Sequence, residues 1–208
     1  MAAQKKSKIA QERDEGARAL WRWLVSRFDL RRLVFVDESG FHTSMDRLRS
    51  RAPKGERAYG KVPRNRGKNT TLIASMSLSG MGESVCVKGA TDSEVFEAYV
   101  ERFLAPTLSE EQVVVLDKLG AHRSKRVKRV RELIEARGAG LVFLPSYSPD
   151  LNPIEEAFSK LKNILRKAGA RTHEALVEAM SWALREVTPW DAAGWFDHCG
   201  YEVEVQYL

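Results

Sequence analysis

The stretch Leu33-Val34-Phe35-Val36, followed by Asp37-Glu38-Ser39-Gly40, decides the fold of this sequence. Four consecutive apolar residues, mostly β-branched or aromatic, predict a short strand buried on both faces, and the polar run after them predicts a loop. The same pattern returns at Val113–Leu116 before Asp117 and at Leu141–Leu144 before Pro145. Three such strands predict the centre of a sheet that other elements cover on both sides.

Further elements are predicted around these three strands. Residues 70–78 and 84–87 have the composition of strands. Helical periodicity extends over residues 95–104, 124–136 and 172–187, and a short aromatic tail lies around residues 190–201. Another helix begins at Asn152-Pro153, where asparagine suits the cap and proline the first helical position. Strands alternating with helices predict an α/β domain whose ligands bind at the carboxyl ends of the strands.

The predicted domain organisation is a helical lead-in over residues 1–30 and one α/β domain with C-terminal helices over residues 31–208. In the lead-in, Leu20, Trp21, Leu24 and Phe28 recur at helical spacing, which predicts a helix packed on the edge of the domain. At 208 residues with 43% hydrophobic content, the chain is long enough to bury one substantial core.

Several protein classes do not fit the sequence. No apolar run approaches the ~20 residues that span a membrane, and the N-terminus lacks the apolar stretch of a secretory signal. The two cysteines, Cys86 and Cys199, are far apart and have no histidine partner at zinc-finger spacing. We therefore expect a cytoplasmic protein with reduced thiols.

The positive charge is unevenly distributed, although the net charge of +6 is itself modest. Nine Lys or Arg residues stand against one acid in residues 47–68, and six stand in residues 122–131 without an acid. Five more lie in residues 160–171, also without an acid. Each run alone is compatible with a solvated face, but three such runs in one domain favour a polyanionic partner.

Asp37 and Asp117 each directly follow a predicted buried strand. A carboxylate at the end of a rigid strand suits a hard divalent cation, whereas a turn-capping aspartate is the alternative for either residue alone. Asp150 is interpreted as a turn residue of Ser148-Pro149-Asp150.

The third carboxylate is either Glu155 or Glu156. At ~100° per residue, Glu155 falls at the border of the apolar helix face and Glu156 points away from it, so Glu155 is the better candidate. Its alternative role is that of a capping-box acid three residues after Asn152. Three converging carboxylates repel one another and attract Mg²⁺, two ions of which activate a nucleophile and stabilise a leaving oxygen.

Three motifs resemble those of bacterial insertion-sequence transposases in the mariner superfamily. They are Val36–Gly40, Val115–Arg123 (VLDKLGAHR) and Leu144–Glu156 (LPSYSPDLNPIEE), and the third is highly specific. The similarity runs from about Arg31 to the C-terminus. It implies a ribonuclease-H-like fold, with a mixed central sheet flanked by helices, and a DDE triad of Asp37, Asp117 and Glu155.

The resemblance also implies an activity and its partners. Mg²⁺, or Mn²⁺ as a substitute, supports cleavage of transposon ends and strand transfer into target DNA at a TA dinucleotide, with two ions when DNA is bound. A homodimer in the DNA complex is expected, acting at the bacterial nucleoid. The family's helix-turn-helix region precedes its catalytic domain, which predicts an upstream segment or protein that binds the transposon ends, as in transposases encoded in two overlapping frames.

The basic runs and the second motif supply the candidate DNA-binding residues. They are Arg64, Arg66, Lys68, Lys118, His122, Arg123, Lys125, Lys160 and Lys162. For His122, a polar helix cap is the alternative.

Lys118 departs from the family, which has asparagine after the second aspartate. An ammonium there either pairs with Asp117 and competes with the metal or points at DNA phosphate. We predict lowered metal affinity and activity, both raised by Lys118→Asn. A degenerate or domesticated DNA-binding remnant is the main alternative function, and another ribonuclease-H-like nuclease is the third.

Overall fold

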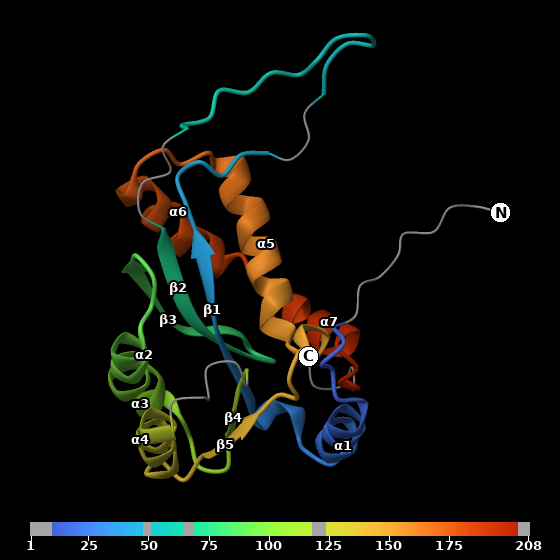
Figure 1. The fold of residues 1–208 in the computed structure, drawn as a ribbon, viewed down its shortest axis with the longest axis vertical. Coiled ribbons are helices and arrows are strands. Elements are labelled where there is room, and N and C mark those ends of the chain that lie inside the picture. The colour runs from blue at the N-terminus through green and yellow to red at the C-terminus, as the bar shows by residue number, and fades with distance from the viewer. Residues whose placement is uncertain (1–9, 48–50, 65–68, 118–123, 204–208) are drawn as a thin grey trace, which may run out of the picture.

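The computed structural model describes residues 10–47, 51–64, 69–117 and 124–203. Its centre is a five-stranded sheet in the order β3-β2-β1-β4-β5 (Figure 1). The antiparallel half is built by β1, β2 and β3, and β1, β4 and β5 run parallel. The bounds of the strands are Leu33–Phe41 (β1), Thr70–Ser77 (β2), Gly80–Lys88 (β3), Val113–Leu116 (β4) and Gly140–Phe143 (β5).

Strand β1 is longer than predicted, and this changes the setting of Asp37. The polar run after Val36 does not form a loop but continues the strand to Phe41, because β2 pairs with it antiparallel from Phe35↔Met76 to Phe41↔Thr70. The parallel pairing with β4 ends at Val36↔Leu116. Asp37 therefore lies within β1 but directly beyond the last residue pair that joins β1 to β4.

Helices cover both faces of this sheet. Before β1 lie α1 (Glu15–Val25) and the 3-10 turn η1 (Leu30–Arg32). Between β3 and β4 lie α2 (Ser93–Tyr99), a π-helical turn η2 (Val100–Leu104) and α3 (Ala105–Thr107), and α4 (Ser124–Glu135) precedes β5. The C-terminal part contains the 3-10 turn η4 (Pro149–Leu151), α5 (Pro153–Ala168), α6 (His173–Arg185) and α7 (Pro189–His198).

The alternation of side chains along β1 sends neighbouring residues into two separate cores. Leu33 and Phe35 pack with residues of α1, α5, α6 and α7. Val34 and Val36 pack on the other face with residues of α2, η2 and α4. The sheet is thus sandwiched between two helical layers, and odd-numbered positions of β1 face the layer that contains α5 (Figure 1).

Helix α1 buries a different face from the predicted one. Leu20, Leu24 and Phe28 are exposed, whereas Trp21 and Val25 belong to the core beside β1. The inner face of α1 also includes the buried Arg18, so it is offset from the apolar stripe that periodicity identifies. Packing against the sheet determines which face of α1 is buried.

The aromatic tail forms helix α7, which the periodicity did not predict. The sequence does contain a start signal, because Thr188 and Asp191 form a capping box and Pro189 occupies the first helical position. Within the described part of the chain, no helix has the length and apolar character needed to cross a membrane.

Candidate carboxylate site

Asp37 and Asp117 come from neighbouring parallel strands at the same edge of the sheet. Each directly follows a member of the last β1–β4 residue pair, Val36 and Leu116. Asp37 has the same parity as Leu33 and Phe35, and Asp117 the same parity as Val113 and Val115, all of which face α5. The register and the alternation together direct both carboxylates toward the helix that contains Glu155.

The pKa of Asp37 responds to the charges of the other two predicted carboxylates. The pKa of Asp37 is raised to about 7, chiefly by burial and further by the charges of Glu155 and Asp117, while hydrogen bonds from the backbone N–H of Glu38 and from Asn152 oppose the rise. The charges of Glu155 and Asp117 thus both act on the Asp37 carboxylate, and their like sign disfavours full ionisation of the metal-free site.

The two glutamates at the start of α5 point to different neighbours. Glu155 is exposed and acts electrostatically on Asp37. Glu156 lies toward α7, with its Oε1 3.8 Å from Nε2 of His198. Of the two glutamates, it is Glu155 whose charge acts on Asp37, which is compatible with the prediction.

Asn152 is the site residue that the sequence reasoning assigned to a different role. It precedes α5 at the cap position, but its side chain makes no capping hydrogen bond. Instead its Nδ2 donates to Oδ2 of Asp37 at 2.8 Å, and Asn152 is only 4% exposed. The capping-box alternative for Glu155 therefore lacks the hydrogen bond that the asparagine side chain would make. No local pattern indicates this contact, because the two residues are 115 positions apart.

Asp150 belongs to the turn before α5, as predicted, and it is paired with arginine. Burial raises its pKa, but hydrogen bonds from Arg18 and the positive charges of Arg18 and Arg13 outweigh this and hold the pKa below its usual value. The preceding Tyr147 has a φ of 55°, a left-handed conformation that is uncommon for residues other than glycine. The turn that leads to Glu155 is thus held in a defined shape.

The ligand atoms of this site suit a hard divalent cation, but their number does not complete a coordination shell. The ligating atoms are carboxylate oxygens, the atoms Mg²⁺ prefers. In the described residues, however, no group of three or more His, Cys, Asp or Glu side chains is close enough to hold a metal ion. Mg²⁺ typically takes one or two carboxylates together with water and phosphate oxygens, so an incomplete protein cage suits a cation that is shared with a phosphodiester.

The predicted DNA-binding residues differ in how they are engaged. Arg64 is exposed, and Lys162 lies with its Nζ 5.8 Å from the ring centroid of Phe41 at the end of β1. Lys160 is committed within the protein, since its Nζ donates to the carbonyl oxygen of Glu186 at 2.7 Å and to Asp191 at 2.6 Å. Five candidates lie outside the described residues, namely Arg66, Lys68, Lys118, His122 and Arg123, and the side chain of Lys125 lies outside them as well.

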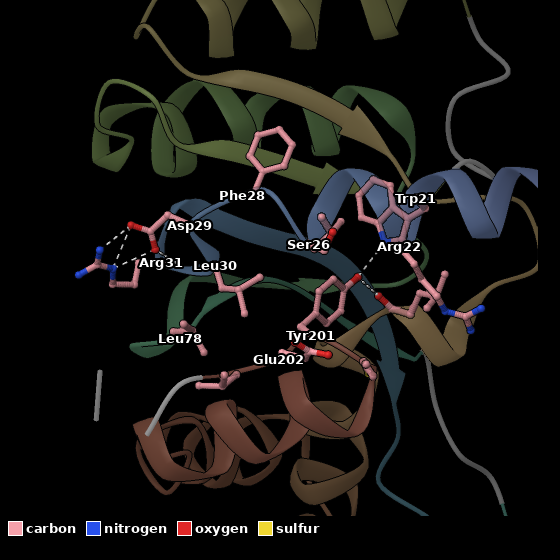
Figure 2. Close-up of a pocket in the computed structure, with 15 residues that line it drawn as sticks. Trp21, Arg22, Ser26, Phe28, Asp29, Leu30, Arg31, Leu78, Tyr201 and Glu202 are labelled. Carbon is pink, nitrogen blue, oxygen red and sulfur yellow. Dashed lines mark hydrogen bonds and ion pairs between the residues drawn. The ribbon is translucent and has the colours of Figure 1, made fainter. Parts of the chain in front are cut away.

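Two pockets lie near this end of the molecule. A pocket of about 620 Å³ opens between the end of α1, Leu78 and Tyr201, and its lining includes none of the three candidate carboxylates (Figure 2). A smaller one of about 280 Å³ is lined by Glu155, Glu156 and His198 among others. Of these two pockets along the described residues, the smaller adjoins the candidate site through Glu155.

Comparison with known proteins identifies the family to which this architecture belongs. The model of the DDE superfamily endonuclease family matches residues 32–177, which include all three carboxylates. No curated protein sequence matches the chain.

Solved structures of mariner transposases are similar to this chain. The Mos1 transposase paired-end complex with the left transposon end is matched with a TM-score of 0.71 and 19% identity, covering 96% of this chain and 63% of that one. The Mos1 paired-end complex with Mg is matched at 0.70 and 18% identity, covering 96% and 65%. The catalytic domain of Mos1 is matched at 0.60 and 14% identity, covering 97% and 100%.

These likenesses confirm the predicted ribonuclease-H-like fold, a mixed sheet flanked by helices. The chain spans less than two thirds of the Mos1 chains in the two paired-end complexes, at 63% and 65% of their length. Its family match covers more than half of the 208 residues. The chain belongs to the DDE superfamily endonuclease family.

Proposed function

We propose that this chain is the catalytic domain of a DNA transposase, which cleaves DNA at transposon ends and joins the freed ends to target DNA. The observation that carries the proposal is that the charges of Asp117 and Glu155 both act on the half-buried Asp37 in a chain of the DDE family. Like charges beside a half-buried carboxylate oppose folding, so they favour a functional role over a structural one.

In this proposal the three carboxylates hold Mg²⁺, or Mn²⁺ in its place, with two ions when DNA is bound. Such ions activate an oxygen nucleophile and neutralise charge on the phosphodiester. Asp37 and Asp117 supply ligands from rigid strands, and Glu155 supplies one from the first turn of α5. Asn152 holds the carboxylate of Asp37 in one orientation.

The proposed reaction has two steps of the same type. In the first, water attacks a phosphorus atom at the transposon end, a new P–O bond forms, and the P–O3′ bond breaks to leave a 3′-hydroxyl and a 5′-phosphate. In the second, that 3′-hydroxyl attacks a phosphodiester of the target, and the target's own P–O3′ bond breaks. The second step conserves the number of phosphodiester bonds, so it needs no external energy source.

The proposed partners follow from charge and from the relatives. The exposed basic residues, such as those of the segment 51–64, would neutralise DNA phosphates. The relatives include paired-end complexes with transposon DNA, and their chains are longer than this one. We propose that a homodimer assembles on DNA and that a helix-turn-helix segment, in this or another product, recognises the transposon ends.

The test is nicking of supercoiled DNA and strand transfer of a pre-cleaved end in Mg²⁺ or Mn²⁺. We expect both activities in the wild type and their loss in Asp37→Ala and Glu155→Gln, with Glu156→Gln retaining them as the matched control. DNA binding without metal-dependent nicking would contradict the proposal and identify a DNA-binding remnant. Nicking without strand transfer would instead indicate a nuclease.

A further inference from the structure

Helix α1 contains a fully buried arginine beside the turn that leads into the carboxylate site. Arg18 is 0% exposed. Its two terminal nitrogens donate to the two carboxylate oxygens of Asp150, at 3.0 and 2.5 Å. The Asp150 side chain is 51% exposed, so only the arginine charge is withdrawn from water, and the net stability of such a pair is small. A bidentate contact does, however, fix the distance and orientation of the two segments that it joins.

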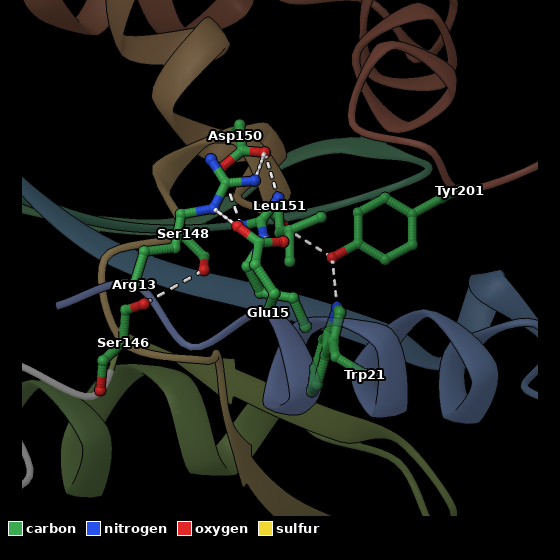
Figure 3. A network of polar contacts seen from close by, with 9 residues as sticks. Arg13, Glu15, Trp21, Ser146, Ser148, Asp150, Leu151 and Tyr201 are labelled. Atoms are coloured by element: carbon green, nitrogen blue, oxygen red, sulfur yellow. Dashed lines mark hydrogen bonds and ion pairs between the residues drawn. The ribbon is translucent and has the colours of Figure 1, made fainter. Parts of the chain in front are cut away.

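A second contact from α1 reaches the next residue of the same turn (Figure 3). The Nε1–H of Trp21 donates to the hydroxyl oxygen of Tyr201 at 3.1 Å, and that hydroxyl donates to the carbonyl oxygen of Leu151 at 2.6 Å. The ring of Tyr201 also packs edge-on against Phe35 of β1, with the centroids 5.5 Å apart. Helix α1 thus constrains the side chain of one turn residue and the backbone of the next.

The turn transmits this constraint to the carboxylates. Asn152 follows Leu151 directly and donates to Asp37. The backbone N–H of Glu155 donates to the carbonyl oxygen of Asn152 at 3.1 Å, so the turn continues into α5 without a flexible link. A displacement of this turn would therefore move Asn152 and Glu155 together, relative to Asp37 in β1.

We propose that α1 is a positioning element of the carboxylate site. Arg18 and Trp21, with Tyr201 as the bridge, hold the turn before α5 and thereby set the distance between Glu155 and Asp37. This inference rests on the proposed function of the site. None of the three residues contacts the carboxylates of the triad, so their effect is on the geometry and the metal affinity of the site and not on the chemistry itself.

The test uses conservative variants that remove these contacts, of which Tyr201→Phe changes the packing least. Tyr201→Phe removes both hydrogen bonds of the bridge and retains the ring, Trp21→Phe removes one donor, and Arg18→Lys removes the bidentate contact. Tyr99→Phe is the matched control, because the Tyr99 hydroxyl also donates to a backbone carbonyl, that of Glu83 at 2.8 Å, and Tyr99 is buried on the opposite face of the sheet.

Three quantities are measured on the full chain: Mn²⁺ affinity by calorimetry, the melting temperature without metal, and the Mg²⁺ concentration for half-maximal nicking. We expect Tyr201→Phe and Arg18→Lys to weaken Mn²⁺ binding by roughly tenfold, as outer-shell changes typically do. The Mg²⁺ requirement should rise equally, and high Mg²⁺ should restore nicking. Trp21→Phe should act in the same direction but more weakly, and Tyr99→Phe should lower only the melting temperature.

The outcomes separate this inference from the proposed function. If the wild type binds Mn²⁺ and nicks DNA, but Tyr201→Phe and Trp21→Phe lower only the melting temperature as Tyr99→Phe does, the positioning role is wrong and the proposed function stands. If Arg18→Lys does not fold, the Tyr201 and Trp21 variants decide. A wild type that binds no Mn²⁺ would overturn both.

Discussion

At the scale of single residues, Asp37 combines properties that a solvent-exposed aspartate does not have. It lies within a strand, accepts two hydrogen bonds and is surrounded by the charges of Asp117 and Glu155. Its pKa of about 7 means that the proton and a divalent cation compete for the same carboxylate near neutral pH. The state of this one side chain therefore controls whether the site is ready for metal.

The raised pKa of Asp37 predicts opposite effects of pH on stability and on metal binding. Between about pH 4 and pH 7 the folded, metal-free chain keeps a proton that the unfolded chain has released. The contribution of this group to the free energy of unfolding is therefore present at low pH and is lost as pH rises through that window. Mn²⁺ affinity should instead fall by about tenfold per pH unit below pH 7.

Calorimetric titrations from pH 5.5 to 8, with denaturation curves in the absence of metal, check both effects. Asp37→Asn removes the titrating group, so it should abolish the dependence on pH that is due to this site. Asp150 is an internal comparison, since its pKa is lowered and it stays ionised over this range. An Mn²⁺ affinity that does not change between pH 5.5 and 7 would contradict the assignment.

Asn152 gives the second prediction at this scale. In Asn152→Ala, Oδ2 of Asp37 loses its donor in a nearly buried position, which should cost about 1–3 kcal/mol of unfolding free energy. The pKa of Asp37 should rise further, because this hydrogen bond favours the ionised form. Denaturation and Mn²⁺ titration measure the two effects, and Mn²⁺ affinity is expected to fall roughly tenfold.

The control for this change is Asn163→Ala at an exposed position of α5, where the side-chain oxygen accepts a hydrogen bond from Arg166. It should alter the free energy of unfolding by less than about 0.5 kcal/mol. If Asn152→Ala destabilised the fold but left Mn²⁺ affinity at the wild-type value, Asn152 would be structural only.

At the scale of elements, α5 connects the site to the C-terminal helices through one face and offers basic side chains on another. Lys160 bonds to the end of α6 and to the first turn of α7, so its ammonium completes the packing of three helices. Lys162, two residues further on, lies with its ammonium near the ring of Phe41. Two lysines of one predicted DNA-binding run thus differ, because the ammonium of Lys160 is hydrogen-bonded within the protein and that of Lys162 lies near an aromatic ring.

This difference predicts different effects of Lys160→Gln and Lys162→Gln. Lys160→Gln should lower the free energy of unfolding by about 1 kcal/mol, a value reduced for partial exposure, and leave the salt dependence of DNA binding unchanged. Lys162→Gln should preserve stability and reduce the slope of log affinity against log salt by about 0.9, the value for one phosphate contact. Denaturation and DNA binding at several salt concentrations distinguish them, and equal salt slopes for the two variants would contradict the assignment.

At the scale of the whole molecule, the charged segment between β1 and β2 is the most exposed feature. Residues 51–64 run away from the sheet and its helices, and nearly all of them are exposed (Figure 1). Their positive side chains contribute little to the packed core. Charge without packing is the combination expected of a surface that contacts a polyanion.

Neutralising this segment should therefore weaken DNA binding without weakening the fold. In the triple variant Arg57→Gln, Lys61→Gln and Arg64→Gln, the slope of log affinity against log salt should fall by roughly two to three, and the melting temperature should stay within about 1 °C of the wild type. The same number of charges removed outside the basic runs, at Arg27, Arg102 and Arg137, serves as control. Equal losses in both variants would show that only net charge matters.

Much of this architecture could be predicted from local sequence. The apolar runs at Leu33, Val113 and Leu141 formed strands because such runs must be buried, and Pro153 began α5 because its ring suits a first helical turn. The family motifs indicated Asp37, Asp117 and Glu155 as the candidate triad. Less predictable were the end of β1 and the inner face of α1, because each depends on a partner that is distant in the chain.

By itself the sequence determined the α/β class, the central strands, the start of α5 and the family of this protein, since burial and local backbone preferences act over a few residues. Only the tertiary structure decided that Asn152 binds Asp37 and does not cap its helix, and that Arg18 holds Asp150 across 132 positions. It also decided that Lys160 forms hydrogen bonds that join α5 to α6 and α7. Polar side chains have several acceptors within reach in sequence, and the fold selects one by bringing together segments that the chain keeps far apart.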